Sequence, residues 1–184
     1  MKLDKIAKVS VGANSFVLRQ KMDNPNIYTN EDIDFDLSQG YWSKDAKSST
    51  GDSLVAGDLI INLMTKKSTI VSPQSEGKII PQNIMRMTVD DSKVYRWYIC
   101  YVLNESETVK RQLFTTMEGS AIRRMTAGSV RGLDIKLPPF EAQKRLGDVY
   151  RQMLIQIRLQ REYSKKINKA ILTILDKNDI NGGK

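Results

Sequence analysis

The sequence contains no histidine and only one cysteine, Cys100. The commonest general base and the commonest metal ligand of proteins are therefore missing. A single cysteine forms no disulfide within the chain, and its apolar neighbours in WYICYVL indicate a small buried residue. The phosphate-binding patterns G-x-x-x-x-G-K-[ST] and G-x-G-x-x-G and the nucleophile pattern G-x-S-x-G are also absent. These absences favour a protein with no catalytic or metal site of its own. A nuclease that uses Asp, Glu and a metal ion is the remaining enzymatic alternative.

The chain also lacks long apolar runs. No stretch approaches the roughly 18 consecutive apolar residues of a membrane span. The N-terminal MKLDKIAKVS is charged where a signal peptide has its apolar core. We therefore expect a cytoplasmic protein with no membrane partner. Its 184 residues, 40% of them hydrophobic, suffice for one domain with a core and an appendage.

The net charge of +8 is unevenly distributed along the chain. Residues 1–90 hold 11 basic and 11 acidic side chains, whereas residues 91–184 hold 18 and 10. An excess of positive charge in one half is typical of proteins that bind an anionic partner, most often a nucleic acid. A basic protein without such a partner is the alternative that charge alone leaves open.

The first half of the chain has the short alternating patterns and turn residues of β-strands. Residues 2–12 and 14–20 have strand character, and an apolar strand is predicted from Leu59 to Met64. Further strands are predicted between residues 65 and 89. The segment 21–40 contains an Asn-Pro pair and ends in glycine, and is interpreted as loop-rich.

Between residues 94 and 114 the apolar spacing changes to that of a helix. The residues that share this spacing are Val94, Trp97, Tyr98, Tyr101, Val102, Val109, Leu113 and Phe114. They predict one or two amphipathic helices that cover the sheet. The aromatic side chains could stack on bases, but residues at helical spacing are more often part of a core.

Two prolines, Pro138 and Pro139, separate the globular part from a long helix. Before them an alternation of Leu133, Ile135 and Leu137 predicts a last strand, which proline ends because it cannot donate to a sheet ladder. After them proline is tolerated at a helix start, and an acidic residue follows in the first turn. We predict a globular domain over residues 1–137, a helix over 138–178 and a flexible tail over 179–184.

A seven-residue repeat runs along the predicted helix. Seven of its nine a and d positions are apolar, which is the pattern of a coiled-coil seam. The a positions are Leu146, Met153, Gln160, Ile167 and Ile174, and the d positions are Tyr150, Ile157, Ser164 and Ile171. The polar pair Gln160 and Ser164 could fix the register at some cost in stability. One small domain cannot cover so long a stripe, so we predict dimerisation through this seam. A helix that folds back on its own domain is the alternative.

The order of these pieces resembles the specificity subunit of type I DNA restriction–modification systems. The resemblance covers about Lys2 to Lys177 and ends in the seamed helix. Its segments are, in order, GDLIINL, PQNIMRM, YRWYICYVLNESETVKRQL and EGSAIRRMTAGSVRGLDIKLPPFEAQKRL. The run Gly-Ser … Leu-Pro-Pro-x-x-x-Gln before the helix is its most specific part. Residues 65–68, TKKS, depart from the pattern, because a glycine-containing turn is expected there.

This resemblance implies an α+β fold with a mixed, strand-rich target-recognition domain, followed by a long helix that forms an antiparallel coiled coil. Family members carry two such units in one chain, whereas this chain has one. The resemblance therefore implies a half-size form that pairs as a homodimer and reads a bipartite palindrome in double-stranded DNA. It also implies methyltransferase and restriction subunits as partners. S-adenosylmethionine, ATP and Mg²⁺ are then expected on those partners, and no cofactor in this chain.

Three predicted loops supply the cations, donors and aromatic rings that duplex recognition needs. Arg123 and Arg124 could reach guanine or hold phosphate, and Gly119 and Ser120 would let the backbone approach DNA. The other candidates are Lys66, Lys67, Ser68 and Thr69 in a second loop and Tyr41, Trp42, Lys44 and Lys47 in a third. Each loop could instead be an ordinary solvated turn.

Three lysines on the predicted helix, Lys165, Lys166 and Lys169, could pass near DNA between the half-sites. A solvated face, or contact with acidic residues of a partner, is the interpretation that the sequence favours for them. For the whole chain, two alternatives to a DNA-reading subunit stay open. One is a coiled-coil interaction protein that contacts protein or RNA, and the other is an inactive or donor specificity cassette.

Overall fold

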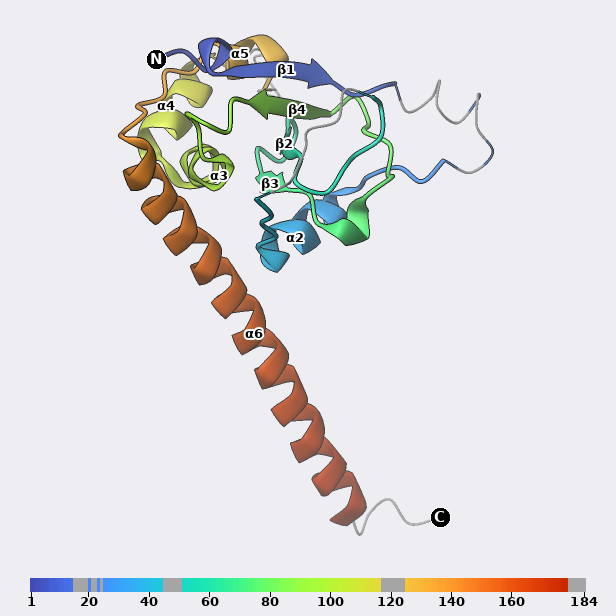
Figure 1. Ribbon diagram of the computed structural model, residues 1–184. Helices are drawn as coiled ribbons and strands as arrows, with labels where there is room; N and C mark the ends of the chain where they lie inside the picture. The colour runs from blue at the N-terminus through green and yellow to red at the C-terminus, as the bar shows by residue number, and fades with distance from the viewer. Residues whose placement is uncertain (15–19, 21–22, 24, 45–50, 117–124, 179–184) are drawn as a thin grey trace.

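The computed structural model describes residues 1–14, 20, 23, 25–44, 51–116 and 125–178. It shows an α+β domain that contains a four-stranded antiparallel sheet. One long helix projects from this domain (Figure 1). This is the fold class expected from the sequence. The elements in chain order, with η for a 3-10 helix, are η1 (Leu3–Lys5), β1 (Ala7–Val11), α2 (Asn30–Gln39), β2 (Leu59–Asn62), β3 (Ser68–Ile70), η2 (Pro73–Ser75), β4 (Ile84–Val89), α3 (Arg96–Glu105), α4 (Glu107–Thr116), α5 (Ala127–Arg131) and α6 (Phe140–Asn178).

The sheet has the strand order β1-β4-β2-β3, and each neighbouring pair is antiparallel. Every residue of β2 is buried. Leu59 and Ile61 belong to the larger core cluster, whereas Ile60 belongs to a smaller one. A strand covered on both faces is expected to be continuously apolar, which explains why the strand at Leu59–Asn62 could be predicted from the sequence.

The larger core cluster lies between the sheet and the helices α3, α4 and α5 (Figure 1). Trp97, at 0% exposure, is its largest member, and its indole Nε1 donates to the Tyr41 carbonyl at 2.9 Å. The helices over residues 94–114 are therefore confirmed, and their aromatic residues Trp97 and Tyr98 are core rather than an exposed stacking platform. Cys100 is fully buried, as expected, and burial raises the pKa of its thiol.

The segment interpreted as loop-rich contains a helix, α2, so that prediction was wrong. The Thr29 side chain accepts from the Asp32 amide, and the Asp32 carboxylate accepts from the Thr29 amide. This reciprocal capping box satisfies donors that the first turn leaves unpaired. Gly40 ends the helix in the left-handed conformation, with φ of 59°. Local capping outweighed the weak apolar pattern of the segment.

The expected last strand over residues 133–137 is also absent from the described sheet. This segment makes a single bridge, between Lys2 and Asp134. Its other polar groups bind elsewhere: the Ile135 amide donates to the Met1 carbonyl at 2.8 Å, and the Tyr98 hydroxyl donates to the Lys136 carbonyl at 2.7 Å. The alternating Leu133 and Ile135 are buried in the larger core cluster, although their segment forms no ladder.

The predicted long helix is confirmed as α6, which begins at Phe140, directly after the two prolines, rather than at residue 138. Its first half packs against α3 and α2 of its own domain. Every residue from 159 to 178 is exposed, along about 30 Å of helix, and most of this half projects beyond the domain (Figure 1). The helix thus folds onto its domain in one half and leaves it in the other. Among the described helices none combines the length and the apolar character that crossing a bilayer requires.

Candidate nucleic-acid interface

Two of the predicted DNA-binding loops lie at opposite ends of the β2–β3 hairpin. Trp42 and Lys44 line a cavity of about 380 Å³ that also contains Gly57 and Ile70, which lie beside the open end of the hairpin. The second loop is the turn between β2 and β3, at the other end. The structure therefore does not bring these two loops together into one patch.

The first loop presents a ring and a cation to solvent. Trp42 is 44% exposed, and Lys44 is also exposed. Both lie near Phe140 and Lys144 at the start of α6, across the same cavity. Tyr41, in contrast, is half-buried and packs against the larger core. Of the candidates in this loop, Lys47 lies outside the described residues.

The second loop is a tight turn built on Asn62. The Asn62 Oδ1 atom accepts from the amides of Met64 and Thr65 at 2.8 and 3.0 Å, and its Nδ2 atom donates to the Asn30 side chain at 2.8 Å. Lys66 takes the left-handed position, with φ of 65°, where the resemblance led us to expect glycine. A lysine rarely adopts this conformation, so support from Asn62 explains how a turn without glycine closes.

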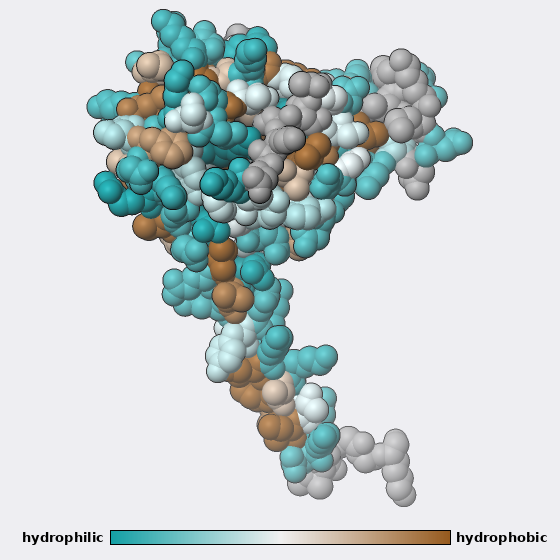
Figure 2. All heavy atoms as spheres, viewed as in Figure 1, coloured by the Kyte–Doolittle hydropathy of each residue, from teal (hydrophilic) through white to brown (hydrophobic). Residues whose placement is uncertain are grey.

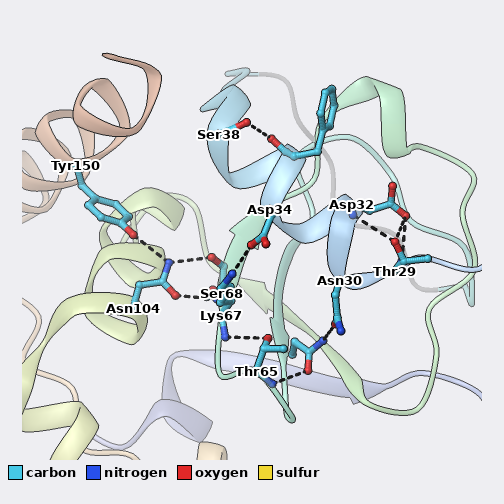
Figure 3. A network of polar contacts seen from close by, with 12 residues as sticks. Thr29, Asn30, Asp32, Asp34, Ser38, Thr65, Lys67, Ser68, Asn104 and Tyr150 are labelled. Carbon is cyan, nitrogen blue, oxygen red and sulfur yellow. Dashed lines mark hydrogen bonds and ion pairs between the residues drawn. The ribbon is translucent and has the colours of Figure 1, made fainter. Parts of the chain in front are cut away.

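The cations of this turn differ in their surroundings. Lys66 and Lys67 are both exposed, and the Lys67 ammonium forms an ion pair with Asp34 of α2 (Figure 3). Ser68 and Thr69 are not in the loop at all, which corrects their assignment. Both lie in β3 at 0% exposure, and the Ser68 hydroxyl donates to the Ile60 carbonyl at 2.8 Å. Buried side chains with internal partners have no access to DNA in this conformation.

The third predicted loop, with Gly119, Ser120, Arg123 and Arg124, lies outside the described residues. Its assignment stays a prediction. The residues on both sides of it are placed: α4 ends at Thr116, and the Thr126 side chain caps α5 by accepting from the Ser129 amide at 3.1 Å.

A groove of about 480 Å³, which was not predicted from the sequence, lies between α2, the β2–β3 turn and α6. Its cations are Lys67, Arg158, Arg161 and Lys165, and its acids are Asp34 and Glu162. The Arg158 guanidinium donates to the Ser38 carbonyl at 3.2 Å and to Glu162 at 3.0 Å. Arg161 and Lys165 form no ion pair within the described part of the chain. The groove therefore gathers a net positive charge from elements far apart in the sequence.

The predicted dimerisation seam divides into two parts. Tyr150 is 5% exposed, because its ring packs on Trp97 and Tyr101 and its hydroxyl bonds to Asn104 and Glu105 (Figure 3). This position serves the protein's own core, which corrects its assignment to a dimer seam. Ile157 is half-buried beside α2. The other seam residues are exposed: Leu146, Met153, Gln160, Ser164, Ile167, Ile171 and Ile174.

The apolar seam residues of the projecting half have no cover. Ile167, Ile171 and Ile174 are 39, 50 and 61% exposed, and Figure 2 shows hydrophobic side chains along this part of α6. Exposed apolar stripes of this kind mark interaction surfaces. Within the residues that the structure places, no group of three or more Cys, Asp or Glu side chains could hold a metal ion.

No family model matches the sequence, and the search of curated proteins found no relative. Solved structures do match. The HsdS subunit from Thermoanaerobacter tengcongensis matches 100% of this chain and 50% of its own, with a TM-score of 0.59 and 17% identity. A chain from a structure on complex assembly and conformational transition of the type I R-M system matches 96% of this chain and 44% of its own, with a TM-score of 0.59 and 16% identity.

A third match is the S subunit of a type I restriction–modification system from M. genitalium. It covers 92% of this chain and 42% of its own, with a TM-score of 0.52 and 11% identity. The present chain thus spans about half the length of each structure that it matches. The resemblance inferred from the sequence is found again in three dimensions: the chain has the fold of about half of a type I specificity subunit.

Proposed function

We propose that this chain is a non-catalytic, half-size specificity subunit that recognises double-stranded DNA and pairs as a homodimer. One observation carries the proposal. The chain reproduces about half of a specificity-subunit fold, and the helix that leaves it has an uncovered apolar seam. A second copy, related by two-fold symmetry, would supply both the missing half and the cover for the seam.

The geometry of the helix supports an antiparallel pair. The domain packs at one end of α6, and the other end projects into solvent. In a parallel pair the two domains would crowd together at the same end. In an antiparallel pair they stand apart, at opposite ends of the helices. Two identical domains held in this way read an inverted repeat with a gap set by the helices.

The reading surface in this proposal comes from the exposed loops. Lys66, Lys67, Trp42 and Lys44 are accessible and of suitable chemistry, and Arg123 and Arg124 remain candidates. Methyltransferase and restriction subunits are the proposed partners. S-adenosylmethionine, ATP and Mg²⁺ act on those partners, and the complex works in the cytoplasm.

The test is to express this chain with a type I methyltransferase subunit from the same genome and to map methylated adenines in the host. The control is the methyltransferase alone. A methylated bipartite palindrome that requires the chain supports a homodimeric reader. An asymmetric motif shows that another chain reads the second half-site. If no methylation depends on the chain, the active-reader proposal is wrong, and an inactive cassette or a coiled-coil interaction protein replaces it.

A further inference from the structure

The exposed face of α6 follows a seven-residue repeat whose second position lies three residues after its first. Tyr150, four residues after Leu146, is 5% exposed because it belongs to the domain's own core, whereas Val149 is 70% exposed. Repeated every seven residues, the positions of Leu146 and Val149 form one stripe that is exposed in both halves of the helix. We call it the contact stripe, and its members are Leu146, Val149, Met153, Gln156, Gln160, Tyr163, Ile167, Ala170 and Ile174.

Charged side chains are rare on this stripe and along its borders. The border positions are the residue before each first position and the residue after each second position, and they include the half-exposed Leu159 and Ile171. Over the five heptads of residues 142–176, the stripe and its borders hold 20 residues, of which only Arg145 and Lys166 are charged. The other 15 positions hold nine charged residues. A nearly uncharged surface about 50 Å long is suited to another apolar helix, not to DNA or an acidic protein.

The contact stripe is complementary to itself when two copies lie antiparallel. First positions of one helix then meet second positions of the other, so the numbers of two facing residues have a constant sum. At a sum of 316 like meets like in every layer. Leu146 faces Ala170, Val149 faces Ile167, Met153 faces Tyr163, and Gln156 faces Gln160 of the second copy. Apolar layers therefore occupy both ends of the pair, and two amide layers occupy its middle.

The neighbouring registers match less well. A shift by one heptad changes the sum to 309 or 323. The two glutamines then face Val149 and Met153, or Ile167 and Tyr163, respectively. An amide that is buried against an apolar side chain loses its hydrogen-bond partners, which is unfavourable. The sum of 316 also gives the longest overlap of the two helices, because residues 140–176 of each copy then lie side by side.

We propose that two copies of this chain pair antiparallel along the contact stripe in this one register, with the Gln156–Gln160 layers on either side of the two-fold axis. The inference rests on the proposed function, because it assumes the homodimer, and it adds which residues meet. A glutamine amide both donates and accepts, so the facing amides satisfy each other. Such a polar layer fixes the register of a coiled coil at some cost in stability. The register in turn sets the separation of the two domains.

Paired cysteines test the register, because a disulfide requires two Cα atoms within about 7 Å of each other. V149C/I167C places the cysteines in one proposed layer. V149C/I174C and V149C/Q160C are the matched controls: their cysteines face each other at sums of 323 and 309, but lie about 10 Å out of line at 316. V149C alone reports a parallel pair, in which identical residues meet. The native Cys100 is fully buried, and wild-type protein controls for it.

Under mild oxidation, V149C/I167C should form at least about tenfold more covalent dimer than either control or V149C alone. All these sites are exposed in the single chain, so the variants should fold. A second experiment removes the amide layers. Q156L/Q160L should lower the dissociation constant of the dimer by about tenfold or more, and in this background V149C/I174C should also cross-link, because the register is no longer fixed.

Other outcomes identify which idea failed. Wild-type protein that sediments as a monomer would overturn the homodimer of the proposed function, and this inference with it. A wild-type dimer in which a control pair cross-links instead would overturn the register alone. A dimer in which no pair cross-links would show that the chains meet outside the contact stripe. An unchanged dissociation constant in Q156L/Q160L would show that the glutamines do not lie in the interface.

Discussion

The side chain of Gln143 at the start of α6 holds the backbone of Tyr95 at the start of α3. The Tyr95 amide donates to the Gln143 Oε1 atom at 3.1 Å. The Nε2 atom of the same glutamine donates to the carbonyls of Lys93 and Pro138 at 3.0 and 2.9 Å. Gln143 is 2% exposed, so it joins three backbone groups in a buried site. This gives a physical role to the glutamine of the Leu-Pro-Pro-x-x-x-Gln run: it fixes the long helix to the domain.

Replacement of Gln143 by alanine should therefore destabilise the domain. The Tyr95 amide would lose its acceptor in a buried site, and one unsatisfied buried donor costs about 1–3 kcal/mol. Chemical denaturation should show at least this loss. Arg145→Ala, at an exposed position, is the control, and its free energy of unfolding should stay within about 0.5 kcal/mol of wild type. An unchanged midpoint in Q143A would show that the three hydrogen bonds contribute nothing net.

Local sequence signals explain which parts of the fold could be predicted. The long helix follows from two prolines and a period of seven, and β2 follows from an uninterrupted apolar run. Both signals are local. The helix α2 was missed, although Thr29, Asp32 and Gly40 form a recognisable set of caps, because only Ile33 and Asp36 of its residues are buried. In this segment the capping signals outweigh the weak apolar periodicity.

The candidate interface was harder to predict, for a different reason. The sequence predicts Ser68 and Thr69 in a loop, but they begin the strand β3, in which every residue is buried. Tyr150 lies at a d position of the heptad, yet its side chain is part of the protein's own core. The α2–α6 groove depends on contacts between residues more than 100 positions apart, such as Ser38 with Arg158. Only the spacing of the arginines and lysines in RLQREYSKKINK could have indicated it.

A second prediction concerns the close approach of α6 to α3. A Cβ atom on Gly147 would lie 2.7 Å from the Tyr98 amide nitrogen and 2.9 Å from the Trp97 carbonyl carbon. These are backbone atoms, so the two helices would have to move apart. Gly147→Ala should cost about 1–3 kcal/mol in the free energy of unfolding. Gly128→Ala is the matched control, because its nearest contact of 3.6 Å is ordinary. Equal stability of both variants would contradict the tight packing.

A third prediction concerns pH and the buried carboxylate of Asp36. Burial raises its pKa above the ordinary 3.8, although hydrogen bonds from Ser72, Tyr28 and Ser75 oppose the shift. A raised pKa in the folded state means that the contribution of this group to stability is complete below pH 3.8. This contribution is lost as the pH rises through the pKa that Asp36 has in the folded state. The free energy of unfolding should therefore fall across this window.

Asp36→Asn should remove this pH dependence and leave the curve flatter than that of wild type. Thermal denaturation between about pH 3 and pH 7 measures the difference, which grows with pH and then becomes constant. Asp4→Asn makes the same chemical change at an exposed carboxylate and serves as the control. Parallel curves for D36N and wild type would show that Asp36 does not titrate in this range.

The last prediction tests whether the exposed seam of α6 is a dimer interface. Ile171 and Leu172 are neighbours, and they are 50 and 60% exposed. Only Ile171 lies on the heptad seam, because successive residues are about 100° apart around a helix. Ile171→Asp would bury a carboxylate without a partner in a coiled coil, which is strongly unfavourable. Leu172→Asp makes the same chemical change outside the seam. We expect wild type and L172D to sediment as dimers and I171D as a monomer. The unfolding of the domain should be unchanged in both variants, because both sites are exposed in the single chain. If I171D still dimerises, the chains pair elsewhere, and if both variants dissociate, the contact is wider than a heptad seam.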